Sequence, residues 1–200
     1  MSRLSPEVRR QAIVDAALAV ALRKGIATTT VRDVAIEMGT SSGLVHHYFD
    51  SMDDVLAAAF AQAAGHDLAA AQLRLKAAVG SRAKLMAFFD GYARAEDDQA
   101  FQLWLDAWAE ATRRPALGAT SKKLNVAWQQ LLARTIRAGV VDGSWTCADP
   151  GATAWRVLSL LDGLALQSVA HGNTIKRSKV VEWSMRLAES ELGLAATSLP

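Results

Sequence analysis

The sequence predicts an all-α fold of about nine helices, with a compact three-helix domain ahead of a larger helical bundle. Three observations support this prediction. Residues of high helix propensity dominate the chain of 200 residues, which contains only four prolines. Apolar residues recur at helical spacing along most of its length. Only the segment 140–146 has the composition of a strand, and it is too isolated to form a sheet.

The first helix is expected to begin at Ser5-Pro6 and to end at Gly25. Serine caps a helix N-terminus and proline fits the first turn, whereas glycine commonly follows the last turn. Apolar residues in this segment follow an i, i+3, i+4, i+7, i+8 pattern, which predicts one buried face. The residues of that face are Ile13, Ala16, Ala17, Val20 and Ala21.

Two shorter helices are predicted next, separated by a glycine turn. The threonines at 28–30 offer hydroxyl caps for a helix over 31–38. Its inward-facing residues are Val31, Val34, Ala35 and Met38. Gly39 ends this helix because a sharp turn requires a residue that tolerates positive φ. Ser41 is expected to cap the following helix, which runs to about residue 48 or 49.

A break at residues 50–51 precedes a long helix over 53–77. Further helices are predicted at roughly 82–97, 99–113, 116–139, 150–171 and 176–192. We place the domain boundary at the first break, which gives an N-terminal domain of residues 1–52 and a C-terminal domain of residues 53–200.

Net charge, cysteine content and apolar segments indicate where the protein is located but say little about its partners. The formal net charge of +2 leaves the class of partner open. The single cysteine, Cys147, excludes an internal disulfide and fits a reducing compartment. No signal peptide is recognisable, and the apolar stretch 157–175 contains Asp162 and other polar residues, which predicts a buried helix. We therefore expect a cytoplasmic protein without a membrane partner.

Enzymatic chemistry finds no support in the sequence. All-helical di-iron enzymes use Glu-x-x-His pairs, and neither these nor a nucleophile motif nor a phosphate-binding glycine loop occurs. His46 and His47 point about 100° apart on a helix, so they are a poor start for a metal site. No catalytic residue, metal or cofactor is expected.

Residues 30–49 match the plan of a helix-turn-helix, with two short amphipathic helices around a glycine turn. In that plan the second helix lies in the major groove of DNA. Leu44 or Val45, together with Phe49, is expected to face the core. The residues left facing DNA are Ser42, His46 and His47. A solvated helical hairpin in any all-α domain explains the same pattern.

The run Thr-Val-Arg-Asp-Val-Ala, followed by Met-Gly-Thr-Ser-Ser-Gly-Leu-Val-His-His-Tyr-Phe, resembles the TetR family of repressors. The resemblance covers about residues 8–58, with weaker similarity at 139–143 and 162–164. It implies a DNA-binding transcriptional repressor that binds a palindromic operator as a homodimer and is released by a small-molecule effector. The alternative is a ligand-independent helical DNA-binding or protein-interaction module.

The resemblance also implies which residues contact DNA. Arg32 matches a position that often reaches a base, where arginine can bind guanine through two hydrogen bonds. Positions that match phosphate contacts are Thr30, His47 and Tyr48. Positions that match base-facing residues are Ser42, Gly43 and His46. The complete set of expected DNA contacts is Thr30, Arg32, Ser41, Ser42, Gly43, His46, His47 and Tyr48.

Two positions depart from the family's pattern. Thr40 stands in the turn where an aliphatic residue is usual, so looser packing is expected there. Met52 replaces the lysine that commonly opens the fourth helix, which removes a phosphate contact. Arginines near the N-terminus are expected to compensate, because affinity depends on how many phosphates are neutralised. These arginines are Arg3, Arg9 and Arg10.

The second part of the chain contains aromatic residues at helical spacing, and the chain has six tryptophans. A pocket lined by aromatic side chains with only a few polar groups is typical of a small-ligand site. A packed helical core explains the same pattern. The stretch 102–117 resembles the choline-responsive, BetI-like branch of the family, which implies a cation held by aromatic rings and balanced by Asp106, Glu110 or Asp162. Asp162 is the better placed of these, because it interrupts an otherwise apolar helix, whereas Asp106 lies about 200° around the helix from Trp104. Alternatively, the Asp162 carboxylate caps a helix or forms a hydrogen bond with a neighbouring backbone group and binds no ligand. The expected ligand residues are Tyr92, Phe101, Trp104, Trp108, Trp155 and Asp162.

The resemblance implies a four-helix dimer interface formed by the last two helices of each chain. A dimer would hold two recognition helices about 34–36 Å apart, the spacing needed to read successive major grooves. The expected interface residues are Leu158, Leu161, Ala165, Val180, Trp183 and Leu187. Both apolar stripes also fit the core within a single chain.

Overall fold

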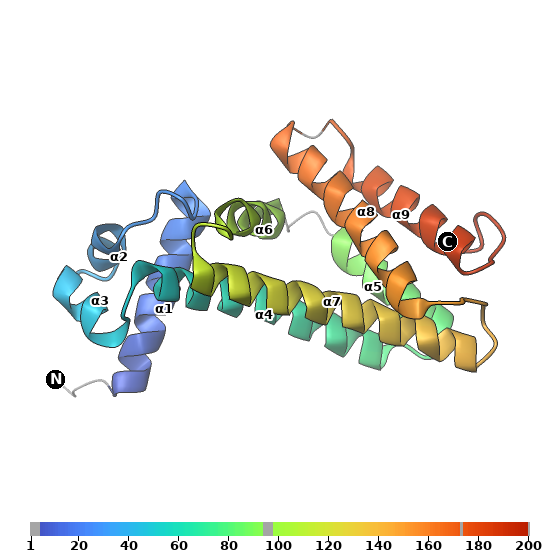
Figure 1. Ribbon diagram of the computed structural model, residues 1–200, viewed down its shortest axis with the longest axis horizontal. Helices are drawn as coiled ribbons and strands as arrows, with labels where there is room; N and C mark the ends of the chain where they lie inside the picture. Colours follow the sequence, from blue (N-terminus) through green and yellow to red (C-terminus); the bar gives the residue numbers. More distant parts are fainter. Residues whose placement is uncertain (1–4, 94–97, 173, 200) are drawn as a thin grey trace. The chain divides into compact units, whose positions relative to one another are not determined.

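The computed structural model describes residues 5–93, 98–172 and 174–199, and these ranges contain nine α-helices and no strand (Figure 1). The helices are α1 (Pro6–Lys24), α2 (Val31–Glu37), α3 (Ser42–Tyr48), α4 (Met52–Ala77), α5 (Ser81–Ala93), α6 (Asp98–Glu110), α7 (Pro115–Val141), α8 (Pro150–Ala170) and α9 (Arg177–Glu191). The predicted all-α fold is confirmed. Helix α6 ends earlier than predicted, and the predicted end of the fifth helix at residue 97 lies outside the described residues.

The chain forms two compact units that interleave along the sequence. The first unit combines residues 1–66 with residues 102–124, and the second combines residues 67–101 with residues 125–200. Helices α4, α6 and α7 each contribute to both units. The two compact units therefore differ from the predicted domains, residues 1–52 and 53–200, whose boundary stays a prediction.

Local signals account for both ends of α1 and for the start of α2, but not for the start of α3. Ser5 accepts a hydrogen bond from the Val8 amide, and Gly25 ends α1 with φ of 88°. Thr30 and Asp33 form a reciprocal capping box at the start of α2. Ser41 occupies the N-cap position of α3 but makes no side-chain capping hydrogen bond, so that part of the prediction is wrong.

Two clusters of buried apolar residues hold the first unit together. One cluster packs α1 to α3 against the start of α4, and Val34, Val45 and Phe49 are all buried in it. The other packs the end of α1 against α4, α6 and the first turn of α7, and includes Ile26 and Phe60. The two short helices α2 and α3 are therefore held by the first cluster, whereas α1 and α4 take part in both.

The second unit is built around α8 and α9, which pack against each other, with α5 also packed on α9 (Figure 1). Asp149 caps α8 by accepting hydrogen bonds from the Gly151 and Ala152 amides at 2.9 and 3.0 Å. After α9, the buried Glu189 accepts hydrogen bonds from the Thr197 and Leu199 amides. The last residues that the structure describes are thereby fastened to α9.

The segment with strand-like composition, 140–146, forms the end of α7 and the start of the connection to α8. Trp145 is buried there, and its indole N–H donates to the Ile136 carbonyl at 2.8 Å. A Cβ on Gly139 would lie 2.1 Å from this indole, so the close approach requires glycine. None of the helices in the described residues combines the length and the apolar composition of a transmembrane span.

Candidate DNA interface and effector site

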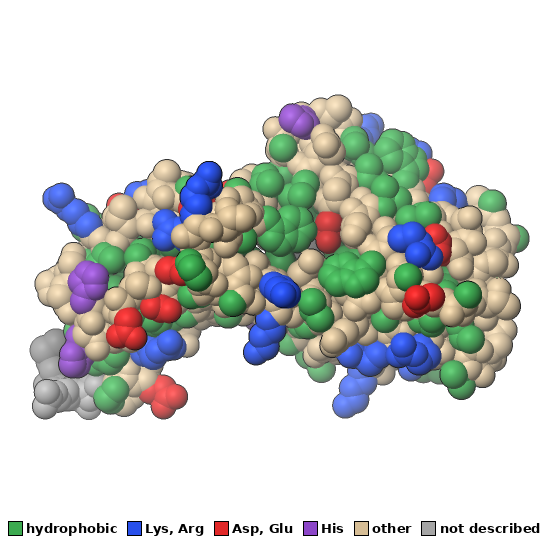
Figure 2. All heavy atoms as spheres, viewed as in Figure 1, with side chains coloured by type: hydrophobic (Ala, Val, Ile, Leu, Met, Phe, Trp, Pro, Cys, Tyr) green, Lys and Arg blue, Asp and Glu red, His purple; other side chains and the backbone are tan. Residues whose placement is uncertain are grey.

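The helix-turn-helix presents polar residues on one side and buries apolar residues on the other. Val45 and Phe49 are buried, which confirms the inward face expected for α3, whereas Leu44 is half-buried. The predicted DNA contacts that are exposed are Thr30, Arg32, Ser41, Gly43, His46 and His47. Ser42 and Tyr48 are half-buried. Histidine side chains gather on the surface over α3 in Figure 2. We call the exposed side of α2 and α3 the reading face.

Ion pairs occupy the charged residues beside the reading face but not Arg32. Arg23 pairs with Glu37 at 2.6 Å, and Lys24 pairs with Asp33 at 2.7 Å. Hydrogen bonds from Lys24 and from Thr30 lower the pKa of Asp33 to about 2. Arg32 is exposed and forms no ion pair within the described residues, so its guanidinium is available to another molecule.

Several residues that were predicted to contact DNA also make contacts within the chain. The Thr30 hydroxyl donates to Asp33 at 2.5 Å, so this side chain already serves the capping box. The rings of His47 and Tyr48 meet edge to face, with centroids 5.0 Å apart. Arg10 lies 4.4 Å above the Phe49 ring, close to the end of α3.

The two departures from the family's pattern have different structural outcomes. Met52 packs against both apolar clusters of the first unit, so it takes a packing role where a lysine would carry charge. Thr40 is half-buried, and its amide donates to the Ala35 carbonyl at 2.9 Å. Arg3 lies outside the described residues.

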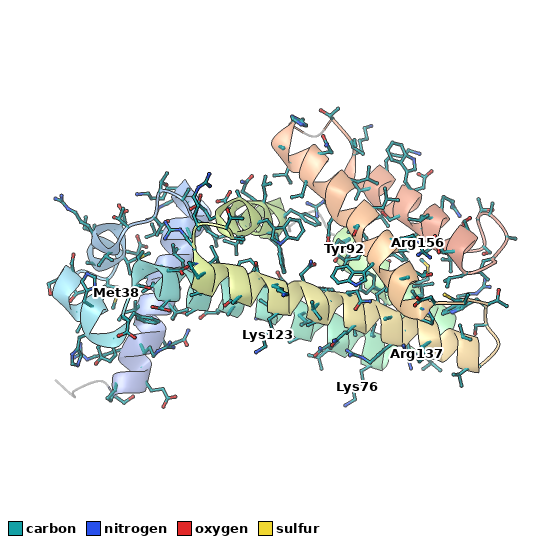
Figure 3. The ribbon with its side chains drawn as sticks, in the orientation of Figure 1. Met38, Lys76, Tyr92, Lys123, Arg137 and Arg156 are labelled. Carbon is teal, nitrogen blue, oxygen red and sulfur yellow. The ribbon has the colours of Figure 1, made fainter. Side chains whose placement is uncertain are left out.

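An aromatic cluster lies within the second unit, around Tyr92 of α5 (Figure 3). The ring centroid of Tyr92 is 5.7 Å from that of Phe88 and 5.9 Å from those of Phe101 and Trp128. The Arg177 guanidinium lies 5.1 Å from the centroid of Phe101. One ring of this cluster therefore already carries a cation from the chain itself.

Two carboxylates add negative potential to this aromatic cluster. Burial raises the pKa of Asp162 to about 7. Burial, together with the charges of Asp162 and Asp67, raises the pKa of Tyr92 well above its usual range. The predicted residues Tyr92, Phe101 and Asp162 thus share one environment, and the prediction missed Phe88, Trp128 and Asp67. The aromatic residues were visible as neighbours in the sequence, but Asp67 lies on the long α4 and gave no signal.

The other predicted ligand residues lie elsewhere in the chain. Trp104 and Trp108 belong to the first unit, where their ring centroids are 5.5 Å apart, and Trp104 also packs against Phe60 at 4.8 Å. Trp155 is 40% exposed on α8, which differs from the lining residue that the sequence suggested.

The predicted dimer residues lie in different environments within the single chain. Most of them are buried inside the chain, because α8 packs against α9 of the same chain. These buried residues are Leu158, Leu161, Ala165 and Val180. Packing within one chain explains this burial, and a dimer contact of these residues stays a prediction. Trp183 is 46% exposed and Leu187 is half-buried, so these two residues stay available to a partner.

Known families match both parts of the chain. Residues 13–59 match the bacterial regulatory proteins of the tetR family, and residues 81–193 match the C-terminal domain of BetI-type transcriptional repressors. The chain belongs to the TetR family. Members of this family are transcriptional regulators and not enzymes, and the TetR helix-turn-helix is the part formed here by α2 and α3.

Curated relatives carry the description HTH-type transcriptional regulator BetI. The relative from Paraburkholderia xenovorans is 31% identical over 179 residues, which cover 83% of this chain and 84% of that protein. The relative from Cronobacter sakazakii is 29% identical over 171 residues, which cover 82% and 81% of the two chains.

Solved structures share the whole TetR fold. A candidate transcriptional regulator from Pseudomonas aeruginosa PAO1 has a TM-score of 0.82 and 28% identity, covering 99% of this chain and 97% of that one. A regulator from Saccharomonospora viridis, solved in complex with choline, has a TM-score of 0.80 and 24% identity. That comparison covers 90% of this chain and 95% of the other.

Proposed function

We propose that this protein is a cytoplasmic repressor that binds a palindromic operator as a homodimer and leaves it when a small cationic effector binds. The observation that carries the proposal is the reading face. Arg32, His46 and His47 are exposed on the two short helices that match the tetR family, while neighbouring charges are paired. Such an arrangement supports contacts with phosphates and base edges.

The proposed roles at the operator follow from exposure and side-chain chemistry. Arg32 binds guanine, because its guanidinium is unpaired and has the fork geometry that guanine accepts. The small residues Ser41, Ser42 and Gly43 allow α3 to approach the base edges, with His46 beside them. The proposed phosphate contacts are Thr30, His47 and Tyr48.

The effector proposed is a quaternary ammonium compound of the choline type. Aromatic rings attract such cations through their negative faces, and Tyr92, Phe101 and Asp162 combine rings with a carboxylate. Arg177 already lies over Phe101 as a cation does in such sites. The choline bound to the S. viridis regulator adds support from a protein of the same fold.

The dimer is proposed to form through the outer faces of α8 and α9. Trp155 and Trp183 are large apolar side chains left 40% and 46% exposed, and Ser159 and Gly163 are small exposed residues that allow another helix to approach. Large exposed apolar groups of this kind are enriched at protein interfaces. Leu187 lies one turn beyond Trp183 and is proposed to join the same interface.

The alternative function is a helical DNA-binding or protein-interaction module without an effector. The packing of Phe88, Tyr92 and Trp128 against one another is what a structural core also requires. The two functions differ in one measurable property, because only a ligand-responsive repressor loses DNA affinity when a small molecule is added.

The proposal is tested by selecting duplexes from random DNA with the purified protein and titrating the best one at several salt concentrations. We expect specific binding to a two-fold symmetric sequence, with affinity that falls steeply as salt rises because phosphate contacts release counterions. Adding choline should lower the affinity. Binding without sequence preference would contradict the repressor, and binding unaffected by choline or betaine would favour the alternative.

The dimer is tested with Trp155→Glu combined with Trp183→Glu. A charge at each position should convert the dimer to a folded monomer, as measured by sedimentation velocity, because two carboxylates cannot be buried unpaired at an apolar interface. Val79→Glu is the matched control, since Val79 is 91% exposed on the loop before α5. A wild-type monomer, or a dimer that persists in the double variant, would contradict this assignment.

A further inference from the structure

Arg177, the first residue of α9, places a positive charge of the chain itself at the aromatic cluster around Tyr92. Its guanidinium carbon lies over the Phe101 ring, 5.1 Å from the ring centroid. Phe101 in turn packs against Tyr92, with centroids 5.9 Å apart, and all three residues belong to the second unit. The guanidinium therefore covers a ring face of the kind that attracts a quaternary ammonium group.

The same guanidinium also contacts the carboxyl end of α5. Its Nη1 donates to the Tyr92 carbonyl at 3.4 Å. Tyr92 lies in the last turn of α5, where carbonyls have no partner within the helix and where the helix dipole is negative. A ring face and a helix end, each of which attracts cations, thus converge on one point, and α9 supplies the cation that lies there.

Asp162 adds a second negative group to this cluster, and Arg177 does not balance it. Burial raises the pKa of Asp162 to about 7, and the described residues place no cation near enough to lower it. The charges of Asp162 and Asp67 act on Tyr92 and help to raise its pKa. A cation drawn to Tyr92 by these carboxylates meets the charge of Arg177 at the neighbouring ring, and two cations at adjacent rings repel each other.

Other basic residues of α9 have carboxylate partners and lie away from the rings. Lys179 pairs with Glu182 at 2.7 Å, and both side chains are exposed. Arg186 pairs with Glu189 at 2.6 Å. Among the described residues of α9, Arg177 is thus the cation that lies over an aromatic ring. Its position makes it a competitor for any cationic ligand of the cluster.

We propose that Arg177 is an internal competitor of the effector, which covers the Phe101 face in the ligand-free protein and leaves it when a quaternary ammonium compound binds. Arg177 then sets the affinity for the effector, because the binding-competent state requires its guanidinium to move away. This inference rests on the proposed function, since it concerns the effector site proposed there.

The test measures choline binding to the DNA-free protein by isothermal titration calorimetry. Arg177→Met keeps a long apolar side chain and removes the charge, and we expect it to bind choline roughly tenfold more tightly than the wild type. Arg177→Lys keeps the charge and should stay within about threefold of the wild type. Lys179→Met is the matched control on the same turn of α9 and should stay within about twofold. Equal or weaker binding by Arg177→Met would overturn the inference.

A second measurement follows the guanidinium directly by nuclear magnetic resonance. The Arg177 Nε–H resonance is assigned by its absence from the spectrum of Arg177→Lys, and Phe101→Leu gives its position without the ring. In the free wild type, the ring should shift this resonance away from that position, and saturating choline should move it back. A resonance that stays in place while choline binds would overturn the displacement. If Arg177→Met does not fold, this measurement decides.

Failure of the proposed function gives different results. A wild type that binds no selected duplex contradicts the repressor, and the choline titrations still test Arg177 because they contain no DNA. Choline that binds without changing the affinity for DNA contradicts the effector role, and the comparison of Arg177→Met with the wild type is unaffected. Choline binding by Arg177→Met but not by the wild type supports the inference. Choline binding by neither overturns it, while the duplex titration still decides whether the protein binds an operator.

Discussion

The first unit and the second unit contain two aspartates with opposite environments. Hydrogen bonds from Lys24 and Thr30 hold the pKa of Asp33 at about 2, whereas burial raises the pKa of Asp162 to about 7. Asp33 is surrounded by donors that favour its charge. Asp162 forms no hydrogen bond or ion pair within the described residues, and its charge is disfavoured.

This difference separates a preformed surface from the proposed effector site. The helix ends around the reading face are satisfied by the chain itself, so α2 and α3 need no ligand to hold their shape. In the second unit, a bound cation would favour the charged form of Asp162 that burial disfavours. A ligand shifts a conformational equilibrium only by its differential affinity for the two states, and an unsatisfied charge is one source of that difference.

The largest expected effect is on DNA binding and tests whether the reading face is preformed. Arg32→Ala should weaken binding to the selected duplex by about 1–3 kcal/mol, because it removes the proposed contact to guanine. Arg23→Ala is the control, since Arg23 is paired with Glu37. Fluorescence anisotropy with matched and guanine-substituted duplexes gives the measurement. Equal losses for both variants would show that Arg32 has no special place at the interface.

An intermediate effect is expected on stability in the second unit. The folded-state pKa of Asp162 is raised to about 7 from the ordinary 3.8, so the folded protein binds the extra proton between these values and loses stability as pH rises through them. Asp162→Asn should therefore stabilise the protein by about 2 kcal/mol at pH 8 and change little at pH 4.

Urea unfolding at the two pH values checks this effect, with Asp90→Asn as an exposed control on α5. The same variant should bind choline less tightly, because the neutral amide offers no counter-charge. A stabilisation that is equal at both pH values would mean that the carboxylate is not the cause.

The smallest effect is expected for Asp33→Asn. The lowered pKa of Asp33 means that its contribution to stability is present above pH 3.8 and is lost as pH falls towards about 2. The variant should melt a few degrees below the wild type at pH 7, and the gap should close between pH 4 and pH 2. Thermal unfolding followed by circular dichroism measures both. A constant gap across this range would assign the loss to the capping geometry and not to the charge.

The sequence by itself determined the helices and the reading face of this protein. Pro6, Gly25, the capping box at Thr30 and the turn at Gly39 are local signals, since each acts through hydrogen bonds or backbone angles within a few residues. The buried Val45 and Phe49 follow from the helical period. The failed prediction among these ends, the Ser41 cap, concerned the orientation of one hydroxyl.

Only the tertiary structure decided which elements meet. Periodicity predicts that Leu158, Leu161 and Val180 are buried, but not that the covering surface belongs to the same chain. The bond between Asp106 and Ile26 joins positions that no local pattern connects. The physical reason is range: a cap or a turn is fixed by neighbouring residues, whereas the partner of a buried face or a distant carboxylate is fixed by how whole helices pack.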